Sequence, residues 1–198
     1  MEDYKKQTIN SYNRDAQWHA EKFKGLLDLN KRPEFQKFIN LLRGKCILDV
    51  GCGGGDHSLY FKSQGLKPYC IDLSEEMIKL CKEKGLKSEV MDMENLDFKK
   101  ETFEGIWAVT SLLHAPKSKM RKVANDLHKI LKQDGILNVC VKEGEGESYD
   151  QKERFFSYWY EEELLDYFNN KFDLIEFWKV SQGGFIYLHF LFKKSKSF

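Results

Sequence analysis

Short apolar runs alternate with amphipathic stretches along most of the chain. Residues 46–51, a run that ends at Asp72, and residues 105–113 have the composition of buried strands. The intervening segments repeat apolar residues at helical spacing; one of them has Ser74 as a candidate N-cap and Gly85 as a terminator. Strands and helices that alternate in this way favour right-handed βαβ units, so we predict an α/β fold with a mostly parallel sheet and helices on both faces.

The two ends of the chain carry different patterns. Residues 9–23 and 33–43 place apolar side chains on one helical face, which predicts two amphipathic helices ahead of the first strand. Near the other end, the apolar runs 172–180 and 185–192 are separated by a short segment with two glycines. Such a segment predicts a tight turn, and the two runs are therefore expected to form an antiparallel hairpin.

Length and charge narrow the possibilities. A chain of 198 residues suits a single domain, and we expect one domain over 1–198 with a helical cap at 1–43 and a core at 44–198. The 32 lysines and arginines balance 31 acidic residues, so no strong field draws the protein to nucleic acid or to an anionic membrane. A small-molecule substrate is therefore favoured.

The five cysteines, Cys46, Cys52, Cys70, Cys81 and Cys140, fall in no CxxC or Cys/His spacing. We interpret them as reduced packing residues and predict no metal. The N-terminus has no apolar core for secretion, and no apolar run approaches the roughly 20 residues that cross a bilayer. We therefore expect a cytoplasmic protein without membrane association, and the pattern leaves a monomer or a homodimer open.

The most informative chemistry lies where the first predicted strand ends. Residues 47–61, ILDVGCGGGDHSLYF, pass from an apolar strand into the order Asp49-x-Gly51-x-Gly53-x-Gly55. Glycine permits positive φ and a close approach of backbone to ligand, while the first N–H groups of the next helix lack internal partners and attract an anion. The pattern predicts a nucleotide-type cofactor site.

The glycine spacing helps to decide between cofactors. A dinucleotide fingerprint needs Gly-x-Gly-x-x-Gly, and Asp56 stands where the third glycine would be, which argues against an NAD-linked oxidoreductase. The motif ILDVGCGGG, with Asp72 closing the second strand and Asp92 following the third, resembles the motifs of class I S-adenosylmethionine-dependent methyltransferases. The resemblance extends over about residues 9–192. It implies a doubly wound, Rossmann-like sheet of seven strands in which strand 7 is antiparallel.

The resemblance also implies how S-adenosylmethionine and its product S-adenosylhomocysteine would be bound. Asp49 would bind or polarise the ammonium of the methionyl part, Asp72 would accept from the ribose hydroxyls, and Asp92 would accept from the adenine amino group. Leu73 and Met77 fit an adenine pocket and the core equally well. The remaining candidate cofactor residues are Tyr12, Gly51, Cys52, Gly53, Gly55, Met93 and Ser111.

The candidate catalytic residue is His114, which lies just beyond the fourth predicted strand. An imidazole with a pKa near 6.5 can take a proton from an attacking hydroxyl, amine or thiol. The rival interpretation is a histidine that shapes the loop or only touches the cofactor. The candidate acceptor-binding residues lie in the first helix or near the irregular segment after the fifth strand; they are Trp18, Glu143, Arg154 and Tyr158.

Together these motifs predict methyl transfer to an O, N or S atom of a small-molecule acceptor. The segment SLLHAP lacks the Pro-Pro-aromatic and Pro-Cys sequences of enzymes that methylate exocyclic amines or cytosine carbon. A tRNA- or RNA-modifying methyltransferase shares the same core, but the neutral charge and the lack of a basic tract argue against it. A non-catalytic regulator that binds S-adenosylmethionine is the other alternative.

Overall fold

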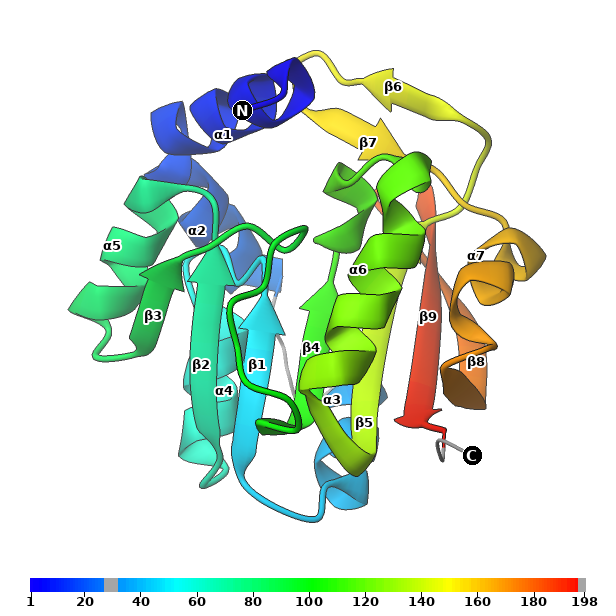
Figure 1. The fold of residues 1–198 in the computed structure, drawn as a ribbon. Helices are drawn as coiled ribbons and strands as arrows, with labels where there is room; N and C mark the ends of the chain where they lie inside the picture. The colour runs from blue at the N-terminus through cyan, green and yellow to red at the C-terminus, as the bar shows by residue number, and fades with distance from the viewer. Residues whose placement is uncertain (27–31, 196–198) are drawn as a thin grey trace.

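The computed structural model describes residues 1–26 and 32–195. A seven-stranded sheet in the order β3-β2-β1-β4-β5-β9-β8 forms its centre (Figure 1). Strands β1 to β5 are parallel to one another, whereas β9 is antiparallel to both β5 and β8. The strands are β1 (Cys46–Val50), β2 (Lys67–Asp72), β3 (Lys87–Val90), β4 (Phe103–Val109), β5 (Leu131–Lys142), β8 (Phe172–Gln182) and β9 (Phe185–Lys194). The predicted α/β class, the seven strands and the antiparallel seventh strand are confirmed.

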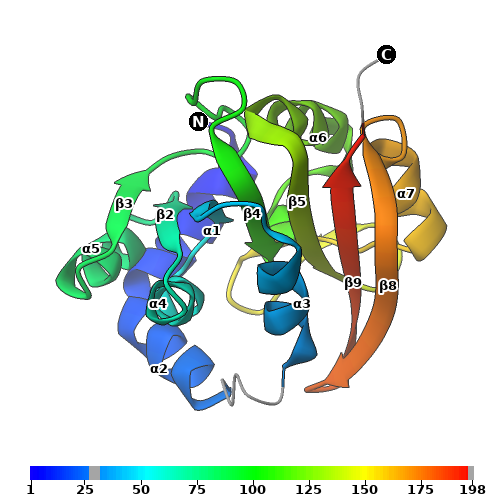
Figure 2. The same ribbon diagram turned by 90° about the horizontal axis from the view of Figure 1, so that it is seen from below.

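Helices cover both faces of this sheet. Helices α6 and α7 lie on one face, and α3 and α4 lie on the other (Figure 2). None of the described helices is long and apolar enough to cross a membrane. The helices are α1 (Asp3–Arg14), α2 (Ala16–Leu26), α3 (Pro33–Leu41), α4 (Asp56–Ser63), α5 (Glu75–Glu83), α6 (Lys117–Ile130) and α7 (Glu161–Phe168).

Successive residues of the central strands alternate between two cores, as expected for a sheet buried on both faces. Ile106 of β4 belongs to the larger core with Leu127 of α6. The next residue, Trp107, packs on the opposite face against Phe61 of α4, and its ring centroid lies 4.6 Å from that of Phe35 in α3. This alternation explains why β4 appears in the sequence as a continuous apolar run.

Two predicted elements differ from the structure. The helix predicted over residues 9–23 is two helices, α1 and α2, which are separated at Asp15. The strand predicted over residues 105–113 ends at Val109, because Thr110 adopts a left-handed φ of 53° and residues 112–114 form a 3-10 turn. This turn brings His114 to the carboxyl edge of the sheet.

The segment predicted to be irregular after the fifth strand contains a small two-stranded sheet. Strand β6 (Glu147–Tyr149) pairs with β7 (Phe155–Ser157). Helix α1 lies beside this small sheet (Figure 1), and the backbone N–H of Phe155 donates to Oγ1 of Thr8 at 2.9 Å. The N-terminal helix and the small sheet therefore meet above the carboxyl ends of the parallel strands.

Candidate active site

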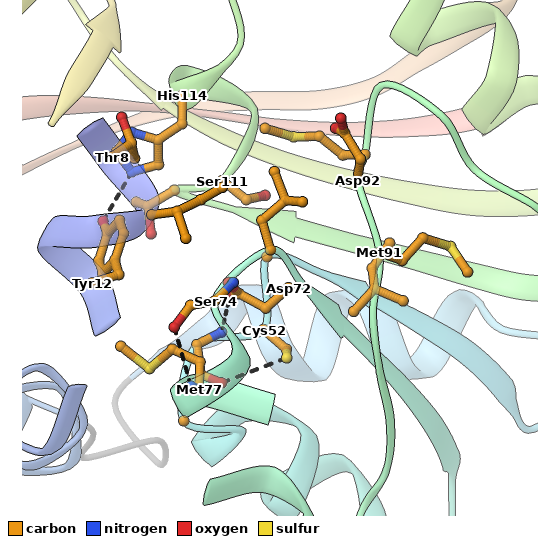
Figure 3. A pocket seen from close by; sticks show the side chains of 18 of the residues that line it. Thr8, Tyr12, Cys52, Asp72, Ser74, Met77, Met91, Asp92, Ser111 and His114 are labelled. Atoms are coloured by element: carbon orange, nitrogen blue, oxygen red, sulfur yellow. Dashed lines mark hydrogen bonds between the residues drawn. The ribbon is translucent and has the colours of Figure 1, made fainter. Parts of the chain in front are cut away.

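A pocket lies at the carboxyl ends of β1, β2 and β4, with helix α1 on one side (Figure 3). The pocket has a volume of about 1150 Å³, which includes the solvent-filled space at its entrance. Ligands in open α/β sheets bind at this edge. The predicted site residues that line the pocket are Tyr12, Gly51, Cys52, Gly53, Asp72, Leu73, Met77, Asp92, Met93, Ser111 and His114.

The glycines of the loop after β1 differ in their structural environments. Gly51 has φ of 64°, and a Cβ there would lie 2.4 Å from Cβ of Ser111, so the loop can pack against the segment that follows β4 only with glycine. Gly53 also has positive φ, but open space surrounds its Cα. Gly55 does not line the pocket; it precedes α4, where a Cβ would meet Sγ of Cys81 at 2.8 Å.

Asp72 is held rigidly at the end of β2. Its Oδ2 accepts from the backbone N–H of Gly53 at 3.0 Å, and its Oδ1 accepts from that of Ser74 at 2.9 Å. Ser74 in turn caps α5 by accepting from the N–H of Met77, as predicted. Burial raises the pKa of Asp72, and each oxygen keeps a lone pair for the hydroxyl of a ligand.

Asp49 lies behind the pocket rather than in its wall. Its side chain is buried, and its Oδ2 accepts from Oγ of Ser58 in α4 at 2.7 Å. Burial raises the pKa of this carboxyl group well above its usual value. In this arrangement Asp49 fixes the start of α4 against β1.

The acidic loop after β3 contacts α1. Nζ of Lys5 lies 2.7 Å from Oδ2 of Asp92 and 2.9 Å from Oε2 of Glu94. The hydroxyl of Tyr4 donates to Oε1 of Glu94 at 2.5 Å. Lys5, Thr8 and Glu94 also line the pocket. Sequence reasoning missed Lys5 and Thr8 because the first helix was predicted to begin only at residue 9, and no motif marked Glu94.

His114 makes a hydrogen bond with each ring nitrogen. Nδ1 lies 2.6 Å from the carbonyl oxygen of Phe155, and Nε2 lies 2.9 Å from the hydroxyl of Tyr12. A carbonyl only accepts, so Nδ1 carries the proton, and in the neutral ring Nε2 accepts from Tyr12. Burial lowers the pKa of His114 to about 4, below the value near 6.5 expected from the sequence. The ring is therefore neutral at pH 7.

Arg154 lies behind Tyr12 and does not line the pocket. Its Nη1 donates to the Tyr12 hydroxyl at 3.3 Å, while Nε and Nη2 donate to Oδ2 of Asp150 at 3.0 and 2.5 Å. Burial raises the pKa of Tyr12 to about 12, so the hydroxyl remains a donor to His114. The residues form a continuous chain of hydrogen bonds from Asp150 to Phe155.

The other three predicted acceptor residues also lie outside the pocket. Trp18 is 48% exposed, and Nζ of Lys152 lies 3.8 Å from its ring centroid. Glu143 pairs with Lys179 at 2.5 Å. Tyr158 lies against Gly144, in the segment between β5 and β6, where an added Cβ would lie 3.2 Å from Cβ of Tyr158. The structure therefore brings His114 together with the cofactor candidates other than Asp49 and Gly55, but not with these side chains.

Comparison with known proteins agrees with this geometry. The model of a methyltransferase domain family matches residues 47–135. The chain is 31% identical over 123 residues to a tRNA (carboxymethyluridine(34)-5-O)-methyltransferase of Arabidopsis thaliana, a match that covers 59% of the chain and 29% of that protein. Residues 47–135 of the chain are therefore similar to methyltransferase domains.

A second methyltransferase matches a shorter part of the chain. The ubiquinone biosynthesis O-methyltransferase of Hahella chejuensis is 36% identical over 89 residues, which cover 44% of this chain and 36% of that protein. The matched regions cover 29% and 36% of these two relatives, so the chain spans about a third of their length.

Solved structures extend the likeness to the whole fold. The 1,6-didemethyltoxoflavin-N1-methyltransferase of Burkholderia thailandensis, solved with its acceptor and S-adenosylhomocysteine, superposes with a TM-score of 0.78 at 20% identity, over 99% of this chain and 92% of that one. The cyclase SpnF superposes with a TM-score of 0.69 at 19% identity, over 82% of this chain and 78% of that one. Because the methyltransferase fold is shared with a cyclase, the fold alone does not fix the reaction.

Proposed function

We propose that this protein is an S-adenosylmethionine-dependent methyltransferase that methylates an O, N or S atom of a small molecule. The observation that carries the proposal is a single pocket with the glycine loop, Asp72 and Asp92 on one side and His114 on the other. The first group suits a nucleoside-containing cofactor, and the second provides a proton acceptor beside it.

The residues present fit S-adenosylmethionine. Both oxygens of Asp72 retain lone pairs for the vicinal hydroxyls of a ribose, and the space beside Gly53 lets a ligand approach its backbone. The thioether side chains of Met77, Met91 and Met93 give the pocket an apolar wall that suits adenine. When bound, this cofactor supplies a methyl group on a positively charged sulfur, which leaves as a neutral thioether.

The chain's own contribution to the reaction is positioning and proton removal. In neutral His114, Nε2 accepts a hydrogen bond from the hydroxyl of Tyr12. A hydroxyl, amine or thiol of the substrate can displace the Tyr12 hydroxyl and bind to Nε2 in its place. The proton would pass to Nε2, while the bond from Nδ1 to the carbonyl of Phe155 keeps the ring oriented. Correct placement contributes several kcal/mol of barrier lowering, and a general base contributes about 100-fold or more.

Charge pairing supports a small acceptor over RNA. Lys5 at the pocket is paired with Asp92 and Glu94, and Arg154 is paired with Asp150. Nucleic-acid binding requires many contacts between basic side chains and phosphates. Basic side chains that are already paired with carboxylates contribute little to such contacts. The relative named as a tRNA methyltransferase favours the alternative that RNA is the acceptor, and competition by bulk tRNA during methylation distinguishes the two.

Calorimetric titration tests the cofactor half of the proposal. S-adenosylhomocysteine should bind and NAD should not, and Asp72→Asn should weaken binding about 10- to 100-fold, which corresponds to about 1–3 kcal/mol for a charge-assisted hydrogen bond. Asp97→Asn is the control, since Asp97 is exposed and does not line the pocket. Absence of binding at millimolar ligand by the folded protein would contradict the proposal. Binding without methyl transfer to any acceptor screened would instead favour the regulator.

A further inference from the structure

Three cysteines from separate elements meet next to the pocket. Cys52 is in the glycine loop, Cys70 is in β2 and Cys81 is in α5. Their Sγ atoms lie within 4.8 Å of one another, and those of Cys52 and Cys81 are 3.7 Å apart. Cys70 and Cys81 are fully buried, whereas Cys52 is half-buried and lines the pocket (Figure 3). Their spacing along the chain gives no sign of this arrangement.

We propose that Cys52, Cys70 and Cys81 form a binding site for a thiophilic metal ion with a filled d shell. Sulfur ligands at about 2.3 Å from such an ion lie about 3.8–4.0 Å from one another. The sulfurs of Cys52 and Cys81 are already near this separation, and the widest pair needs to close by no more than about 1 Å.

The ligand set selects the kind of ion. Thiolates favour soft ions such as Cu(I) and Zn²⁺ over Mg²⁺ or Ca²⁺, which prefer oxygen. Among the described residues, no histidine or carboxylate completes the group, so the site offers three sulfurs. Cu(I) is satisfied by three sulfur ligands, and Zn²⁺ would take a water as its fourth ligand. Cys52 borders the pocket and provides the entry path for ion and water.

The thiolate is the form of cysteine that binds a metal ion, so the three thiol protons are released to solvent as the metal–sulfur bonds form. The hydrogen bond from Cys81 to the carbonyl of Gly53, 3.2 Å in the metal-free protein, is given up in this step.

An ion at this site would join three elements that also build the pocket. The glycine loop carries Gly53, the end of β2 carries Asp72, and α5 carries Met77. Bound metal would therefore stabilise this side of the pocket against local opening. The inference rests on the sulfur geometry alone and holds whichever molecule fills the pocket.

The remaining two cysteines supply matched controls. Cys46 is exposed at the start of β1, and Cys140 is buried in β5, where its Sγ lies 3.4 Å from Nε2 of His189. Neither belongs to the cluster. Cys46→Ala controls for the removal of an exposed thiol, and Cys140→Ala controls for the removal of a buried thiol.

The test is a titration of the whole chain with Cd²⁺, under a phosphine reductant that keeps all thiols reduced. Cd²⁺ is a soft d¹⁰ probe whose bonds to thiolate absorb in the ultraviolet. We expect one equivalent to bind, with an affinity that increases with pH and a higher melting temperature. Cys52→Ala should weaken binding at least about tenfold, whereas Cys46→Ala and Cys140→Ala should bind as the parent does.

The wild-type measurement keeps the test decisive if a buried substitution prevents folding. Wild-type protein that shows no cadmium–sulfur absorption overturns the proposal. So does absorption that survives in folded Cys52→Ala or disappears in Cys46→Ala, because the ion would then be bound elsewhere.

Discussion

The two sides of the pocket are built from the chain in different ways. The side with Gly53, Asp72 and Asp92 comes from one continuous stretch of chain, which runs from β1 through α4, β2 and α5 to the loop after β3. On the other side, the hydroxyl of Tyr12 bonds to His114, 102 residues away, and to Arg154, 142 residues away. The first side depends on local motifs, whereas the second exists only after distant segments have packed together.

This difference suggests which property each side controls. Loop and strand ends whose backbone is already fixed by glycine and by capping provide a preorganised cofactor site. The other side is held by contacts between the N-terminal helix, the 3-10 turn and the small sheet. Its side chains can be substituted more easily to suit different methyl acceptors. Substitutions on the two sides should therefore separate cofactor affinity from turnover.

The largest effect is expected at the glycine that joins the two sides. Gly51→Ala places a Cβ 2.4 Å from Cβ of Ser111 and keeps an alanine at positive φ. We expect a loss of about 3 kcal/mol or more in the free energy of unfolding, together with loss of S-adenosylhomocysteine binding. Urea denaturation and calorimetry measure the two quantities.

Gly65→Ala provides the matched control for this substitution. Gly65 has φ of 81°, and a Cβ there meets nothing within 4 Å. The backbone strain alone should cost about 1–2 kcal/mol and leave binding unchanged. Equal destabilisation by the two substitutions would show that the contact with Ser111 does not matter.

The same contrast explains what could be predicted from the sequence. The role of Asp72 depends on Gly53 and Ser74, and the cap on α5 depends on Ser74 and Met77, so short motifs contain the required information. The mostly parallel sheet follows from the alternation of strands and helices, and the antiparallel hairpin follows from the final glycine turn. These features are set by neighbours along the chain and by the rules of βα connection.

What was missed depends on contacts between distant segments. Nothing near Lys5 in the sequence indicates that it will meet Asp92, and a spacing rule cannot bring Cys52, Cys70 and Cys81 together. The strand predicted to continue beyond Val109 stops because Thr110 takes a left-handed conformation, although two leucines follow at 112 and 113. Tertiary packing, rather than local propensity, decides each of these cases.

His114→Ala tests the acceptor side, and we expect about 100-fold or more loss of turnover with little change in cofactor affinity. Because burial lowers the pKa of His114 to about 4, the base is deprotonated above that pH and its contribution is lost only as the pH falls through about 4. Turnover measured from pH 5 to 9 should therefore show no inflection from this group. An inflection near pH 6.5 that disappears in the variant would contradict the buried, neutral imidazole.

His128→Ala is the control for removing an imidazole. His128 is on α6 and packs against Phe172, away from the pocket. Its substitution should leave turnover unchanged at a temperature where the protein is folded. Near-normal turnover in both variants would mean that positioning alone accounts for catalysis.

The smallest effects should come from two tyrosines at opposite ends of α1. Tyr12→Phe removes the hydroxyl that bonds to His114 and Arg154, while Tyr4→Phe removes the one that bonds to Glu94 beside Asp92. Each loses about 1 kcal/mol of hydrogen bonding, equivalent to a few-fold change. We expect Tyr12→Phe to alter turnover at saturating cofactor and Tyr4→Phe to alter cofactor affinity. If both substitutions change the same quantity, α1 acts as one rigid cover, and the separation between a local cofactor side and an assembled acceptor side is wrong.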